Sequence, residues 1–60
     1  MKIKVTNHEH KTQKTVDSCL TVRQYAIINS MGFFKVIKVD KEYNLIEPFT
    51  GEILYTISWA

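Results

Sequence analysis

Apolar and polar residues alternate at both ends of the chain, which is typical of strands that bury one face. Near the start, over residues 2–6, Ile3 and Val5 point to one side and the other positions hold lysine or threonine. Near the end, over residues 52–59, large apolar side chains occupy every second position: Ile53, Tyr55, Ile57 and Trp59. The pattern predicts a strand in each segment.

Further strands are predicted between these ends. Residues 12–19 carry a weaker alternation after a short polar segment, so they form a hairpin with the first strand. Residues 33–40 are rich in β-branched and aromatic residues and place apolar groups on both faces, as a central strand does. A short strand at residues 43–47 precedes a tight connection in which Pro48 fixes φ and Gly51 supplies a positive φ. The last three strands therefore form a meander.

A short helix is predicted in the middle of the chain. Thr21 is followed three residues later by Gln24, which is the spacing of a capping box at a helix start. Leu20 and Tyr25 stand at the two positions of a hydrophobic staple. Gly32 can adopt the left-handed conformation that ends a helix. With its start at residue 22, set by the capping box, the helix is predicted to have about ten residues.

One broad face of this helix is suited to packing on the sheet. At about 100° per residue, five residues share that face: Val22, Tyr25, Ala26, Ile28 and Asn29. Ile27 and Met31 point away from it, and we predict that both are exposed to solvent.

Together these elements predict an α+β fold in the order ββαβββ. We expect a mostly antiparallel sheet of about four to five strands with one short helix packed on one face. Residues 1–60 are expected to form a single domain, since a chain this short holds one hydrophobic core at most. An alternative interpretation makes residues 18–25 another strand and the whole chain a small barrel.

The small size of the chain favours association with a second copy. A domain of 60 residues buries only ~60% of the surface that its unfolded chain exposes. Small folds compensate with disulfides, metals or partner chains. The single cysteine, Cys19, excludes an internal disulfide, and we expect it to be a small buried apolar side chain. Self-association is the commoner of the remaining solutions.

Two histidines one residue apart, His8 and His10, raise the question of a metal site. On a strand they would point the same way, as two zinc ligands do, but a zinc site needs three or four ligands. Only Asp17 and Cys19 stand where they would complete it. A solvated turn whose imidazoles contact nothing is the more frequent outcome, so we predict no metal and no other cofactor.

Enzymatic activity is not expected. The six acidic residues fall mostly at predicted turns and strand ends, and the two glycines are too far apart to form a phosphate-binding loop. A chain this small also has difficulty enclosing the pocket of at least ~300 Å³ that a small-molecule site needs.

We therefore expect a small non-enzymatic protein-binding or regulatory module that forms a homodimer and also binds a second, unidentified protein. The predicted contact residues are apolar: Ile27, Met31, Tyr55, Ile57 and Trp59. The last strand is expected either at a sheet edge, where it would pair with another chain, or inside the sheet with Trp59 closing the core.

The alternative is a small nucleic-acid-binding protein. A net charge of +2 permits a nucleic-acid partner without requiring one. A sheet face carrying lysines and an aromatic ring would hold phosphates and stack bases. The residues expected to do so are Lys2, Lys4, Lys35, Lys38 and Tyr43.

The sequence also bears on location and origin. No apolar run approaches the ~20 residues that cross a bilayer, and the unpaired cysteine favours a reducing, cytoplasmic setting. Lysine, isoleucine and asparagine are frequent while arginine, glycine and proline are scarce, a usage typical of AT-rich genomes. We expect a protein encoded by a phage or another mobile element that modulates a host protein.

Overall fold

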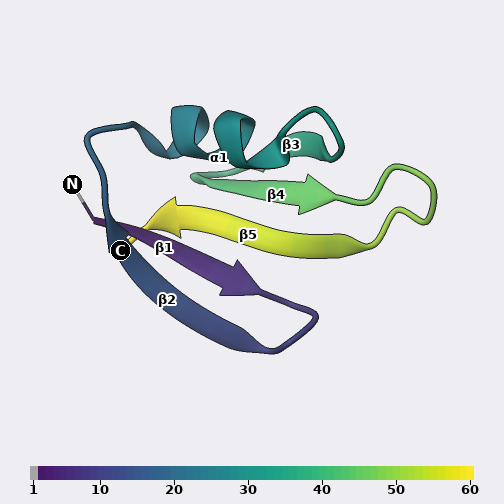
Figure 1. The fold of residues 1–60 in the computed structure, drawn as a ribbon, viewed down its shortest axis with the longest axis horizontal. Helices are drawn as coiled ribbons and strands as arrows, with labels where there is room; N and C mark the ends of the chain where they lie inside the picture. Colours follow the sequence, from purple (N-terminus) through teal and green to yellow (C-terminus); the bar gives the residue numbers. More distant parts are fainter. Residues whose placement is uncertain (1) are drawn as a thin grey trace.

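The computed structural model describes residues 2–60 and confirms the predicted α+β order (Figure 1). The elements are β1 (Lys2–Asn7), β2 (Thr12–Asp17), α1 (Val22–Ser30), β3 (Lys35–Val39), β4 (Glu42–Ile46) and β5 (Ile53–Trp59). All strand pairs are antiparallel, and the spatial order is β2-β1-β5-β4-β3. The alternative barrel is wrong, because residues 22–30 are helical.

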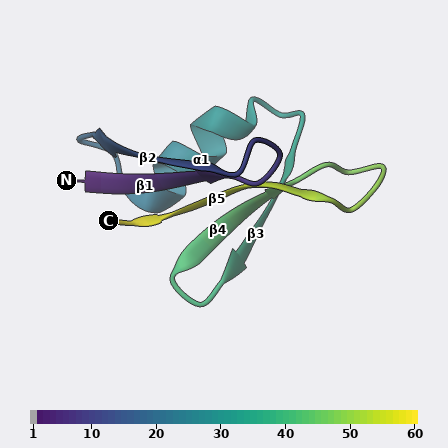
Figure 2. The same ribbon diagram turned by 90° about the horizontal axis from the view of Figure 1, so that it is seen from below.

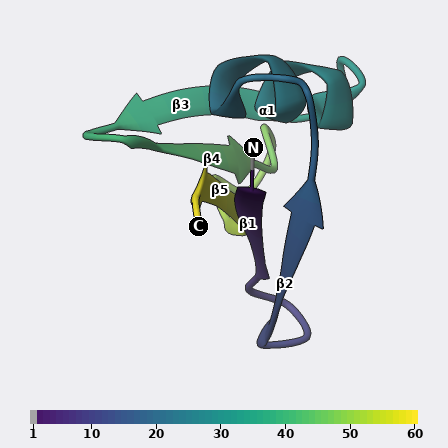
Figure 3. The ribbon, with the colours of Figure 1, turned by 90° about the vertical axis from the view of Figure 1, so that its left-hand side faces the viewer.

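The sheet is strongly twisted, and α1 covers only part of one face. Figure 3 shows β1 and β2 running across the direction of β3 and β4, as the right-handed twist of strands accumulates over the sheet. The helix packs on β3, β4 and β5. In Figure 2 the β3–β4 hairpin projects away from the β1–β2 pair. The uncovered part of the helix-bearing face therefore lies over β1 and β2.

Two strand positions differ from those expected. β5 lies at the centre of the sheet between β1 and β4, so the interpretation of the last strand as an edge is wrong. β3, which was expected to be central, is an edge strand. The apolar groups on both of its faces are therefore not explained by burial, since Ile37 and Val39 are exposed.

The core lies between α1 and the middle of the sheet. Its apolar residues, all buried, are Ile3, Val5, Val22, Ala26, Leu45 and Ile57. Val5 pairs with Ile57, and Ile57 pairs in turn with Tyr43. At the rim the ring of Phe34 meets that of Tyr55 edge-on, with centroids 6.3 Å apart. The half-buried aromatic rings thus extend a core that has few fully buried side chains.

The helix begins with the predicted capping box. The backbone N–H of Gln24 donates to Thr21 Oγ1 at 3.2 Å, and the backbone N–H of Thr21 donates to Gln24 Oε1 at 3.1 Å. At the other end Met31, not Gly32, takes the first left-handed conformation, with φ 51°. Gly32 follows with φ 76°, so the chain reverses over two residues. The helix has nine residues, close to the predicted length.

Replacing Thr21 with alanine is expected to lower the free energy of unfolding by about 1 kcal/mol, because the Gln24 N–H loses its acceptor. For a domain of this size that corresponds to a fall in Tm of about 4 to 8 °C in a thermal melt followed by circular dichroism. The matched control is Thr21→Ser, which keeps the hydroxyl. Equal losses in both variants would contradict a role for the cap.

The buried side of α1 differs from the predicted face at its C-terminal end. Ile28 and Asn29 are exposed, whereas Ser30 is buried. Ala26, fully buried, marks the line of closest approach to the sheet. Ser30 can be buried because its hydroxyl donates to the backbone carbonyl of Ile27 at 2.7 Å. The prediction that Ile27 and Met31 are exposed is confirmed.

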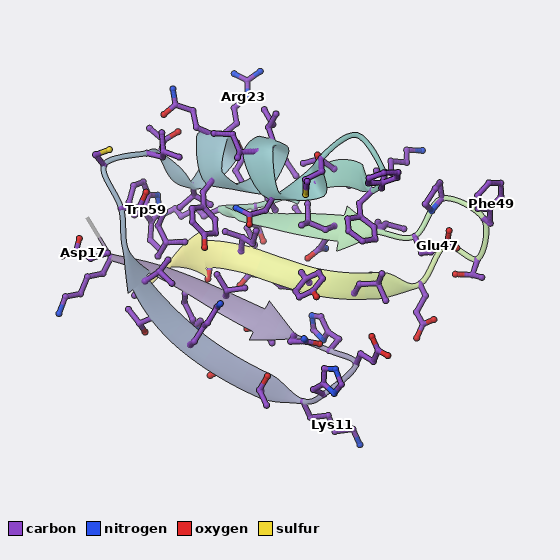
Figure 4. The ribbon with its side chains drawn as sticks, in the orientation of Figure 1. Lys11, Asp17, Arg23, Glu47, Phe49 and Trp59 are labelled. Carbon is purple, nitrogen blue, oxygen red and sulfur yellow. The ribbon has the colours of Figure 1, made fainter. Side chains whose placement is uncertain are left out.

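The connection from β4 to β5 is organised by Glu47. Its carboxylate accepts hydrogen bonds from the backbone N–H groups of Phe49, at 3.0 Å, and Thr50, at 2.6 Å. Partial desolvation raises the pKa of the Glu47 carboxyl, but these hydrogen bonds outweigh it and hold the pKa below its ordinary value. Gly51 has the predicted positive φ, 76°. The loop presents Phe49 at its tip, almost fully exposed (Figure 4).

Candidate interaction surface

The structure separates the five predicted contact residues. Ile27 and Met31, on and just after α1, are 49% and 75% exposed. Trp59, at the end of β5, is 45% exposed, and Tyr55 is half-buried. Ile57 is only 1% exposed. Because β5 is the central strand, Ile57 lies in the core and cannot contact another molecule, so we remove it from the candidate surface.

Several exposed apolar side chains lie on β3 or on the chain just before it, with Ile37 and Val39 on the face without the helix. We call the following group the β3 surface: Ile27, Met31, Phe33, Ile37 and Val39. Residues 31–34 connect α1 directly to β3, which places Met31 and Phe33 at the start of that strand. The sequence shows all five as apolar, but only the position of β3 at the edge of the sheet places exposed Ile37 and Val39 beside an unpaired strand.

The placement of Ile27 follows from the geometry of the helix. Tyr25 and Asn29 line a cleft together with residues of β1 and β2. Arg23, on the other side of α1, lines a shallow recess together with Lys38 of β3. Ile27 lies one turn after Arg23 and therefore shares its side of the helix. This is the side toward β3.

The two edges of the sheet differ in chemistry. Among residues 2–60, β3 pairs only with β4, so one row of its backbone N–H and C=O groups has no partner strand. The same holds for β2, which pairs with β1. The exposed side chains of β2 are all polar or charged: Thr12, Gln13, Lys14, Thr15 and Asp17. Exposed apolar residues on an edge strand favour pairing with another chain, and only β3 has them.

The residues predicted to hold nucleic acid do not form one surface. Alternation along each strand places Lys2, Lys4 and Lys35 on the face without the helix, whereas Lys38 and Tyr43 lie on the helix-bearing face. Lys4 pairs with Ser58 near the end of β5, whereas Lys35 pairs with Ile46 opposite the beginning of β5. The three lysines are therefore spread along and across the sheet.

Lys38 and Tyr43 belong to a smaller basic recess. The Lys38 ammonium lies 6.0 Å from the centroid of the Tyr43 ring. Together with Trp59 they line a recess of about 240 Å³ whose other charged residues are Arg23, Asp40 and Lys41. Three cations and one carboxylate thus surround two aromatic rings, an arrangement suited to a flat anionic ligand.

A larger cleft of about 420 Å³, which was not predicted from the sequence, lies between α1 and the β1–β2 hairpin. Tyr25 and Asn29 form one wall, and Thr12 and Lys14 lie on the other side. A helix is about 10 Å wide and strands are ~4.8 Å apart, so one helix covers roughly two or three strands of five. The predicted element count was therefore enough to indicate an uncovered area. Among residues 2–60, the titratable side chains that line the cleft are Lys14, Tyr25 and Tyr55.

The histidine segment forms the turn between β1 and β2, but His8 does not project free into solvent. Its Nε2 lies 2.7 Å from Thr56 Oγ1, and the Thr56 hydroxyl donates to Asn44 Oδ1 at 2.9 Å. His8 is therefore the donor to Thr56, which places the proton on Nε2. This corrects, for His8, the expectation that the imidazoles contact nothing.

Cys19 is exposed in the bend between β2 and α1, which corrects the prediction of a buried side chain. In the part of the chain that the structure describes, no three histidine, cysteine, aspartate or glutamate side chains lie close enough together to hold a metal ion. His8 and Asp17 belong to the same β1–β2 hairpin but lie at its opposite ends. They cannot ligate one metal ion together.

Across residues 2–60 no helix has the length and apolar character needed to cross a membrane.

Comparisons with known proteins do not assign this chain to a family. No family model matches the sequence, and neither a curated protein nor a solved structure is significantly similar to it.

Proposed function

We propose that this protein is a non-enzymatic interaction module that self-associates through the β3 surface. The observation that carries the proposal is an unpaired strand edge that carries exposed Ile37 and Val39 on the face without the helix, while Ile27 of α1 is exposed on the other face of the sheet. An edge strand gives main-chain hydrogen bonds to a partner, and apolar side chains beside it supply the burial that stabilises the contact.

The total exposed surface supports this proposal. A folded monomer of 7.0 kDa is expected to expose about 4,000 Å². This chain exposes 4423 Å². The excess, together with the small number of fully buried side chains, is what a second copy would reduce.

Light scattering across a dilution series tests the proposal. At high protein concentration the mass is expected to approach twice 7.0 kDa, and on dilution it should fall to 7.0 kDa. Added salt should not weaken association strongly, because apolar contacts are not screened. A mass that stays at that of one chain at every concentration would contradict the proposal.

The basic recess favours nucleic-acid binding as a second candidate function. Trp59 is the only tryptophan of the chain, and it lines this recess beside Lys38. Stacking of a base on its ring is expected to quench the intrinsic fluorescence, and salt should reverse the quenching because lysines contact the phosphates. A titration with single-stranded oligonucleotides that leaves the fluorescence unchanged at low salt would eliminate this candidate.

A further inference from the structure

We propose that two copies of this chain join β3 to β3 in antiparallel orientation, with Ile37 on the two-fold axis. The result is one continuous sheet of ten strands, five from each copy. This inference rests on the proposed self-association and specifies its geometry: which strands pair, in which register, and which residue lies at the centre.

The symmetry of an antiparallel pair restricts the register. A two-fold axis normal to the sheet keeps each face of one copy continuous with the same face of the other. Paired residues must therefore come from the same face, which means Lys35, Ile37 and Val39 on one side and Val36 and Lys38 on the other. Centring the axis on Ile37 is the one such register that pairs all five residues of β3.

The charges of β3 agree with that register. It places Lys35 opposite Val39 of the second copy, and Val36 opposite Lys38 of the second copy, so that no lysine lies directly opposite another. Sliding the strands so that Lys38 lies on the axis would shorten the pairing to three residues and oppose two ammonium groups, which is destabilising. The other neighbouring register, centred on Val36, also pairs only three residues of the strand.

The side chains on both faces of the proposed β3–β3 pair are complementary to those of a second copy of the same chain. Ile37, which is 36% exposed, would contact Ile37 of the second copy on the face without the helix. On the helix-bearing face, the two α1 helices would flank this pair with their Ile27 sides toward each other. The strand KVIKV is thus complementary to itself when reversed, with valine opposite lysine and isoleucine opposite isoleucine. β2, with its polar exposed side chains, offers no comparable pairing.

A disulfide across the axis tests the register directly. In a Cys19→Ser background, Ile37→Cys would place two thiols opposite each other with Cα atoms about 4.5 to 5.5 Å apart, within the range that a disulfide spans. Mild oxidation is expected to convert most of this variant to a covalent dimer on non-reducing electrophoresis. The matched control is Thr15→Cys in the same background, which places an exposed thiol on the same face of the other edge strand.

The outcomes separate this inference from the proposed function. A covalent dimer of the Ile37→Cys variant, with no covalent dimer of the Thr15→Cys variant, supports the proposed β3–β3 pairing. If light scattering shows a dimer but the Ile37→Cys variant forms no disulfide, the β3–β3 pairing is wrong and self-association through another surface remains. A protein that is monomeric at every concentration contradicts both proposals. If the cysteine variants do not fold, hydrogen exchange on the unaltered protein decides: the β3 amides that do not bond to β4 must become protected as the concentration rises, and the outer amides of β2 must not.

Discussion

Replacing Leu45 with alanine is expected to lower the free energy of unfolding by about 3 kcal/mol. Leu45 is 2% exposed and lies in β4, where it pairs with Val36 on one side and Tyr55 on the other. The lost side chain leaves a cavity beneath α1 that the short helix cannot fill. A domain of 60 residues has a total stability of roughly 3 to 9 kcal/mol, so this one substitution removes a large part of it.

A thermal melt at fixed protein concentration checks this prediction, since association would otherwise shift the transition. The Tm is expected to fall by at least about 12 °C. The matched control is Leu54→Ala, the same change in β5 at a half-buried position on the face without the helix. Its cost should be about 1 kcal/mol. Similar losses at Leu45 and Leu54 would mean that the core is not centred under α1.

Replacing Ile37 with lysine is expected to weaken self-association by a factor of roughly 100. Each dimer would lose the burial of the exposed part of two isoleucine side chains, about 1 kcal/mol apiece, and a factor of ten corresponds to about 1.4 kcal/mol. The two new ammonium groups would also face each other across the axis, and like charges directly opposite on paired strands repel. Sedimentation velocity or light scattering over a dilution series measures the change.

Thr15→Lys is the control for this experiment. Thr15 is exposed on the other edge strand and on the same face of the sheet as Ile37, so it receives the same new charge. Self-association should be unchanged in this variant, and circular dichroism should show both variants folded. Equal weakening by the two substitutions would point to the net charge of the protein, and not to β3, as the cause.

The strands β2 and β3 show which features of the sheet were predictable from the sequence and which were not. Both segments were predicted as strands, and both are. Apolar residues on both faces are typical of a central strand, so residues 33–40 were placed inside the sheet. That inference assumed that apolar side chains are buried within the same chain. The exposure of Ile37 and Val39 shows that this assumption fails for β3.

The helix shows the same division within one element. Its start at Thr21 was predictable because a capping box joins residues three positions apart. The exposure of Ile27 and Met31 was also predictable from helical periodicity. The burial of Ser30 in place of Ile28 was not, because it depends on the angle at which α1 lies on the twisted sheet.

The five strands, the helix with its N-terminal cap and their order along the chain were all predictable from local sequence patterns. These features arise from interactions between residues a few positions apart, which act before any distant segment is in place. The position of β5 at the centre of the sheet and of β3 at its edge became known from the three-dimensional fold alone. This strand order depends on the pairing of β1 with β5, in which Ile3 lies opposite Trp59 although the two residues are near opposite ends of the sequence. No local pattern encodes such a pairing, and the candidate interaction surface is a consequence of it.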